Sequence, residues 1–159
     1  IVLSVVTFIY TIVRWRIDES RRADEERHRQ ANKIASWLEG TDAIVVNSSD
    51  LPIYGVAIVI EQGPWFYSGN REPGAPACYP GAIALCQLVP PGKWRVSIPN
   101  AKYCNGCGAY PSVKIGFVST NGTSWVRDSR GNLSEIGTDP FMFFGLTAPY
   151  PFTEIQQVD

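Results

Sequence analysis

Apolar and polar residues follow three different patterns along the chain. Residues 1–13, IVLSVVTFIYTIV, are almost continuously apolar, and residues 14–40 are mostly charged until apolar residues return near residue 31. From residue 41 onward, short apolar runs alternate with turn residues. The pattern predicts an apolar helical end at 1–13, a charged juxtamembrane helix at 14–40, a β domain at 41–137 and an aromatic, proline-rich arm at 138–159.

The first segment resembles the end of a membrane helix. Thirteen helical residues span roughly 20 Å, whereas a bilayer core needs about 20 residues, so we expect residues 1–13 to be the C-terminal part of a transmembrane helix. A signal-peptide core and a buried helix are the alternatives. Trp15 lies between Arg14 and Arg16, as at membrane interfaces, and no small-residue cleavage site follows. We expect a single-pass protein of the cell membrane, and the basic flank favours a cytoplasmic domain while leaving the side open.

Residues 14–40 contain no proline and no internal glycine. Opposite charges lie four positions apart, as in Asp18 with Arg22, and each such pair supports an exposed helix by about 0.2–0.5 kcal/mol. Apolar residues then return with helical spacing at Ala31, Ile34, Ala35 and Leu38. We therefore expect this end of the helix to dock on the next domain, with Gly40 as its C-cap. A homomeric coiled coil is less favoured because the heptad repeat fails between Ile17 and Ile34.

The region after residue 41 has the pattern of an all-β domain. Its short runs are rich in valine, isoleucine and aromatic residues and lie at 43–47, 53–61, 82–89, 93–99, 112–119 and 124–128. Breakers such as Pro90-Pro91-Gly92 separate them, and Asn121-Gly122 between two runs is a strong hairpin signal. Short strands punctuated in this way predict an antiparallel β-sandwich, preceded by a single long N-terminal helix.

The stretch NSSDLPIYGVAIVI shows how this sandwich is expected to form. One strand should end at Asn47, the chain should turn through residues 49–52, and the next strand should begin at Ile53. Along that second strand Val56, Ile58 and Ile60 alternate with other residues. They would therefore share one face and contribute to the core between two sheets.

Two insertions and the C-terminal arm interrupt this pattern. Residues 63–81 contain four prolines and predict a long loop with a short strand at 65–67, and residues 100–111 form the second insertion. In the arm, residues 141–146 predict a last strand. The arm's aromatic residues would form an adhesive surface if exposed, so they either pack on the sandwich or bind a partner. The candidate partner-binding residues are Phe141, Phe143, Phe144, Tyr150 and Phe152.

Several phrases of the sequence occur together in one protein family. They are QANKIASWLE, VVNSSDLPIYGV, LVPPGKWRV and IGFVSTNGTSWVRDSRGNLSEI, and they lie within residues 30–136. The positions that carry the match are Gln30, Ala31, Ile34, Trp37, Asn47, Ser49, Asp50, Pro52, Tyr54, Pro90, Pro91, Gly92, Trp94, Phe117, Gly122, Trp125, Arg127, Gly131 and Leu133. In these phrases the chain resembles a family of actinobacterial membrane-anchored proteins with a charged juxtamembrane helix. The resemblance implies an Ig-like β-sandwich near the membrane and carries over no catalytic residues.

The chain departs from that family at a few positions. Gly55 stands where the family has Asp, and Ser119 stands where its turn has Asp. The two insertions with their cysteines are also outside the family pattern. These insertions are where this chain could differ in function.

The cysteines are candidate ligands or cross-links. They are Cys78, Cys86, Cys104 and Cys107, all in or beside the two insertions. Cys104 and Cys107 have the C-x2-C spacing of a zinc knuckle, but Cys78 and Cys86 do not form a standard half-site. Two disulfides, a structural zinc site and four free thiols all stay open, because the choice depends on the compartment. A thioredoxin-like role is not favoured without a βαβ unit.

Composition limits the classes of function. A net charge of −1 gives no basic surface for nucleic acid, and the single histidine, His28, lies on the charged helix, away from any serine. The acidic residues sit in or beside turns, where they cap backbone groups. The prediction is a non-enzymatic binding or scaffold module without a cofactor, an accessory subunit that binds other membrane subunits or copies of itself. The alternative is a metal- or redox-responsive module that uses the four cysteines.

Overall fold

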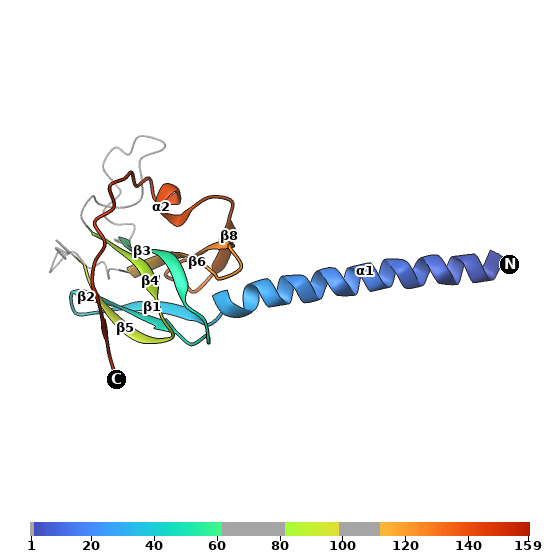
Figure 1. Cartoon of the computed structure of the whole chain (residues 1–159), viewed down its shortest axis with the longest axis horizontal. Helices are drawn as coiled ribbons and strands as arrows, with labels where there is room; N and C mark the ends of the chain where they lie inside the picture. Colours follow the sequence, from blue (N-terminus) through green and yellow to red (C-terminus); the bar gives the residue numbers. More distant parts are fainter. Residues whose placement is uncertain (1, 62–81, 99–111) are drawn as a thin grey trace.

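The structure is a computed structural model that describes residues 2–61, 82–98 and 112–159. A 30-residue helix, α1 (Val2–Ala31), projects from one side of a mainly β domain (Figure 1). Within the described ranges, no helix is both long enough and apolar enough to cross a membrane. The long N-terminal helix expected from the charge pattern is present as α1.

The predicted extent of this helix, through residue 40, is wrong. The helix ends at Ala31, and β1 (Ile34–Glu39) begins after a two-residue turn. Gly40 is therefore not the C-cap of the helix. With a φ of 65°, it is the first residue of the tight turn between β1 and β2 (Asp42–Asn47), and Glu39 pairs with Asp42 across this turn. Glycine adopts such a positive φ without steric cost. Of the apolar residues predicted to form a helical face, Ala31 ends the helix, whereas Ile34, Ala35 and Leu38 belong to the edge strand β1.

Two antiparallel sheets make up the β domain. One has the order β1-β2-β5-β9, and the other has the order β4-β3-β6-β7-β8. The remaining strands are β3 (Ile53–Glu61), β4 (Ile83–Val89), β5 (Gly92–Ser97), β6 (Ser112–Val118), β7 (Ser124–Arg127), β8 (Leu133–Ile136) and β9 (Ile155–Gln157). The six strands predicted between residues 43 and 128 are confirmed, the short strand predicted at 65–67 lies outside the described residues, and β1, β8 and β9 were not predicted.

One apolar core lies between the sheets, as in a β-sandwich. Val56, Ile58 and Ile60 of β3 belong to it, as predicted from their alternation, together with Val45 of β2 and Val96 of β5. Burial of such side chains contributes about 1.5–3 kcal/mol each relative to exposure. The core therefore holds the two sheets together.

The two predicted turns are confirmed. β2 ends at Asn47 and β3 begins at Ile53, so residues 48–52 cross from one sheet to the other. Between β6 and β7, Gly122 has a φ of 83°, and the Ser119 N–H donates to the carbonyl oxygen of Thr123 (2.9 Å). Both turns contact the end of α1 through Gln30.

The C-terminal arm packs on the domain, but not as the predicted strand over residues 141–146. A short helix, α2 (Pro140–Phe143), begins there, because the Asp139 carboxylate accepts a hydrogen bond from the Phe141 N–H (2.8 Å) and proline follows at the first helical position. Gly116 of β6 makes room for it: an added Cβ would lie 2.8 Å from the Phe144 ring. The arm then forms β9 on the opposite sheet, antiparallel to β5.

Candidate functional site

The end of α1 is fixed to the sandwich by the side chain of Gln30. Its Nε2 donates to the carbonyl oxygens of Leu51 (3.2 Å) and Pro52 (3.0 Å) in the β2–β3 turn. Its Oε1 accepts from the N–H (3.0 Å) and the hydroxyl (2.9 Å) of Thr120 in the β6–β7 turn. One amide therefore joins the helix to one turn through its nitrogen and to another through its oxygen. We call the contacts of residues 28–31 with these turns and with β7 the helix joint.

The β2–β3 turn is shaped from within to present these carbonyl groups. The Asn47 side chain is buried, donates to the carbonyl oxygens of Leu51 (2.9 Å) and Val89 (3.3 Å), and accepts from the Ser49 N–H (3.1 Å). The Ser49 hydroxyl lies 2.6 Å from Asn47 Oδ1 and 2.8 Å from the Leu51 carbonyl oxygen. Asn and Ser commonly close turns in this way. The stretch NSSDLP therefore serves to hold the helix.

The β6–β7 turn and its neighbouring tryptophan form the second half of the helix joint. Trp125 is fully buried, and its Nε1 donates to the Ser119 hydroxyl (3.1 Å). The His28 ring lies over Trp125, with ring centroids 4.6 Å apart and an interplanar angle of 60°. Such tilted aromatic pairs add about 0.5–1.5 kcal/mol beyond area burial. His28 is thus a packing residue of the helix joint.

Arg127 caps the helix from β7. Its Nη2 donates to the carbonyl oxygen of Ala31 (3.1 Å), and its Nη1 donates to that of Gly131 (2.7 Å). Burial lowers the pKa of the Arg127 guanidinium, and the nearby Asp128 opposes this effect. A hydrogen bond from the Asn132 side chain, followed by backbone N–H donors, holds the pKa of Asp128 below its usual value. The carbonyl group of Ala31, the last residue of α1, thus accepts a hydrogen bond from the positively charged Arg127, an arrangement that the helix dipole favours.

A pocket of about 140 Å³ opens beside the helix joint. Its lining comes from the helix end and from both turns: Arg29, Gln30, Lys33, Ser49, Asp50, Leu51, Thr120 and Asn121. Two cations and one carboxylate share it, so its charge is mixed. This arrangement lacks a nucleophile paired with a base.

The structure describes one of the four candidate cysteine ligands. Cys86 on β4 is 1% exposed in the central core, and burial raises the pKa of its thiol to about 12. A zinc ligand is a thiolate, so this environment is that of a core residue. Cys78, Cys104 and Cys107 lie outside the described residues. The four-cysteine site and the disulfides therefore stay predictions, with Cys86 as their weakest member.

The aromatic residues of the arm divide into a packed group and an exposed one. Phe141 is buried with Ala57 and Leu85 on the outer face of the β4–β3 pair, and Phe144 and Tyr150 pack against this cluster. Phe143 and Phe152 are exposed. Among the candidate partner-binding residues, Phe143 and Phe152 therefore offer the most apolar surface, although the Phe152 ring also contacts Phe141 and Tyr150.

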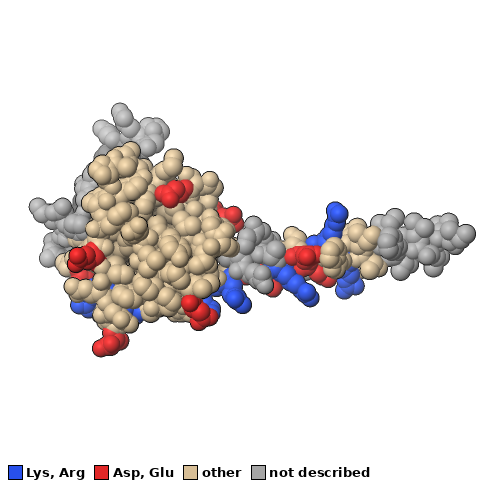
Figure 2. All heavy atoms as spheres, viewed as in Figure 1, with Lys and Arg blue, Asp and Glu red and all other residues tan. Residues whose placement is uncertain are grey.

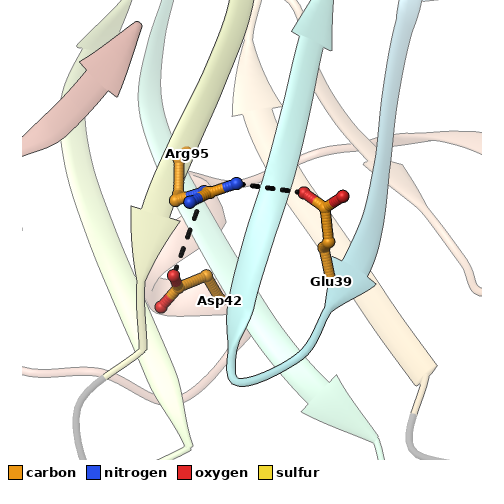
Figure 3. A network of polar contacts seen from close by, with 3 residues as sticks. All are labelled: Glu39, Asp42 and Arg95. Atoms are coloured by element: carbon orange, nitrogen blue, oxygen red, sulfur yellow. Dashed lines mark hydrogen bonds and ion pairs between the residues drawn. The ribbon is translucent and has the colours of Figure 1, made fainter. Parts of the chain in front are cut away.

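Charges on the domain surface form local networks. On the outer face of the β1-β2-β5 sheet, the Arg95 guanidinium lies 3.3 Å from a carboxylate oxygen of Glu39 and 4.0 Å from one of Asp42 (Figure 3). Figure 2 shows acidic and basic side chains close together along α1, whereas charges on the visible face of the sandwich are few and separated. Among the described residues, no group of three or more His, Cys, Asp or Glu side chains could hold a metal ion.

Several residues of the helix joint were singled out from the sequence, but their contacts with one another were not predicted. Gln30, Asn47, Ser49, Trp125 and Arg127 all carry the family resemblance, yet their role as one network was not predicted. The available signal was the polarity of Asn47 and Ser49 at the end of a strand, where turn residues were expected for local reasons. Comparisons of the chain with protein-family models, curated proteins and solved structures found no match.

Proposed function

We propose that this chain is a non-enzymatic, membrane-anchored scaffold module, an accessory subunit of a larger membrane complex that presents an Ig-like sandwich on a stiff helical stalk. The observation that carries the proposal is the pair of opposed contacts of Gln30 with Leu51 and Thr120. A freely jointed linker needs no such contacts. A helix fixed at its end transmits the position of its anchor to the domain.

The strand order supports the Ig-like description. An Ig-like sandwich places strands A, B and E in one sheet and C, F and G in the other. Here β1, β2 and β5 are neighbours in one sheet, and β3, β6 and β7 are neighbours in the other. β4 extends the second sheet beside β3, and β8 and β9 are additions at two edges.

The exposed apolar side chains of α1 support the membrane anchor. Tyr10 and Trp15 are each 63% exposed, and Val13 and Ile17 are about half exposed. Water does not stabilise such a surface on an isolated helix, so lipid or a partner helix must cover it. Arg14 and Arg16 flank Trp15 where a membrane interface would lie, which favours a cytoplasmic domain.

Membrane fractionation tests the anchor and the complex together. The full chain, expressed at native level, is expected to resist carbonate extraction and to migrate with larger species in blue-native electrophoresis. Ile12→Asp combined with Val13→Asp, both exposed on the membrane side of Trp15, should release it from the membrane, whereas Thr147→Asp, on the surface of the domain, should not. Extraction of the unmodified chain by carbonate, or its migration as a monomer, contradicts the proposal.

A further inference from the structure

The sheet edges of the domain are protected unequally. The outer side of β4 is partly covered, because Leu85 pairs with Phe152 and its carbonyl oxygen accepts from the Thr153 N–H (2.7 Å). β8 and β9 are edges of only four and three residues. β1 is an edge of six residues in unbroken register with β2, and no other described strand pairs with its second side.

The register shows which backbone groups of β1 are open. The Ser48 N–H donates to the carbonyl oxygen of Lys33 (3.0 Å), so odd-numbered residues from 33 to 39 form the hydrogen-bonded pairs with β2. Antiparallel strands alternate such pairs with pairs whose backbone groups point away. The N–H and C=O groups of Ile34, Ser36 and Leu38 therefore face the open side.

The usual devices that block an edge are absent from β1. It has no proline, no bulge and no lysine within its six residues, although natural edges are commonly protected by these features. On its outer face Trp37 is 43% exposed, with Ala35 on one side and Glu39 on the other. Lys33 precedes the strand on the same face. The edge therefore offers an aromatic side chain between Lys33 and the half-exposed carboxylate of Glu39, which also lies 3.3 Å from the Arg95 guanidinium.

Geometry argues against a second copy as the occupant. Antiparallel pairing of two β1 strands about a two-fold axis rotates one copy by half a turn within the plane of the sheet. Since β1 continues from α1 across the sandwich (Figure 1), the two α1 helices would then point in opposite directions. Two copies anchored in one membrane cannot meet in this way, so a strand of another protein fits better.

We propose that β1 receives an extended segment of a partner protein as an added antiparallel strand, with Trp37 as the central side-chain contact. Charge complementarity defines the segment: a basic residue opposite Glu39 at its first position and an acidic residue opposite Lys33 at its seventh. A small residue at the third position leaves room for Trp37, and a bulky one at the fifth covers Ala35. The inference rests on the proposed accessory-subunit function and names its docking surface.

A peptide with this pattern tests the edge directly. Residues 32–40 of the chain, NKIASWLEG, satisfy it when paired antiparallel with β1, because Lys33 of the peptide meets Glu39 and Ala35 of the peptide meets Trp37. We expect saturable binding of the fluorescein-labelled peptide to the full chain in detergent micelles, measured by anisotropy. A peptide with its lysine and glutamate exchanged should bind about tenfold more weakly, since two cross-strand pairs become like-charged.

Ser36→Pro in the protein is the decisive variant. It removes an N–H that does not pair with β2, so the fold should persist while peptide binding falls at least tenfold. The matched control is Glu135→Pro on the β8 edge, whose N–H also faces outward by the register of β7 and β8. The Glu135→Pro variant should bind the peptide as tightly as the unmodified chain does.

Several results overturn this inference. They are absence of peptide binding up to about 1 mM, equal binding by Ser36→Pro and the unmodified chain, or a dimer of the chain itself that Ser36→Pro dissociates. Each leaves the membrane fractionation result intact, so failure of the inference is distinguishable from failure of the proposed function.

Discussion

The helix joint and the C-terminal arm attach two flanking segments to the same sandwich with a different balance of hydrogen bonds and apolar contacts. At the helix joint, Gln30 and Arg127 bind backbone groups through directed hydrogen bonds. In the arm, the Phe141 ring packs with Tyr150 (centroids 4.7 Å apart) in an apolar cluster. Hydrogen bonds fix direction but add little net stability, whereas apolar burial adds stability with little direction.

This difference matches what each segment must do. A stalk has to keep a fixed angle to the sandwich, and the side-chain amide of Gln30, hydrogen-bonded on two sides, resists rotation of α1. An arm has to remain attached to the domain. Its strand β9 pairs with β5, and Phe141 of α2 packs against Ala57 and Leu85. We therefore expect changes in the arm to lower stability most and changes in the helix joint to alter geometry most.

The largest expected effect is that of Phe141→Ala. Removing this buried ring leaves a cavity against Ala57 and Leu85, and it should lower the free energy of unfolding by about 3 kcal/mol. Phe143→Ala is the matched control, because this neighbouring ring is 47% exposed, and it should change stability by less than about 0.5 kcal/mol. Urea unfolding followed by circular dichroism measures both, and equal effects would mean that the arm is not packed as described.

Gln30→Ala should have a moderate effect on stability. The Pro52 carbonyl loses the Gln30 donor and the N–H and hydroxyl of Thr120 lose their acceptor, whereas the Leu51 carbonyl keeps the hydrogen bonds from Asn47 and Ser49. Water reaches this partly exposed site, so the cost should be about 1–2 kcal/mol. Asn32→Ala, an exposed change in the same turn, is the control. Hydrogen exchange of residues 28–31 should quicken in the first variant only. Unchanged exchange would show that Gln30 does not fix the helix.

Arg95→Ala should have the smallest effect. Its ion pairs with Glu39 and Asp42 are substantially exposed, and exposed pairs contribute about 0.2–1 kcal/mol and weaken with salt. We expect a loss below about 1 kcal/mol in thermal unfolding that disappears near 1 M NaCl. A larger loss that persists in salt would mean that the network on this face is structural.

Local sequence signals predicted the middle of the sandwich but failed at β1. The strands around NSSDLP and Asn121-Gly122 were found because alternation and turn residues agree there. At β1, Ile34 and Leu38 lie four positions apart, and a spacing of four places residues on one face of either a helix or a strand. Only the burial of Ile34 between the sheets separates the two readings, and burial depends on the rest of the fold.

The helix joint could not be predicted for a related reason. Gln30 and Thr120 are 90 positions apart, and no periodicity links them. The arm shows the same limit: the aromatic run at residues 141–144 suggested a strand, but Asp139 and Pro140 begin a helix that Gly116 accommodates. In both places long-range contacts decide between local alternatives.

The distance between the stalk and the sandwich tests the central claim most directly. Spin labels introduced as non-canonical amino acids at Glu19 on α1 and Ser97 on β5 would report it by double electron–electron resonance in the full chain. The account predicts one narrow distance distribution that broadens in Gln30→Ala and stays narrow in Asn32→Ala. A broad distribution in the unmodified chain would contradict it.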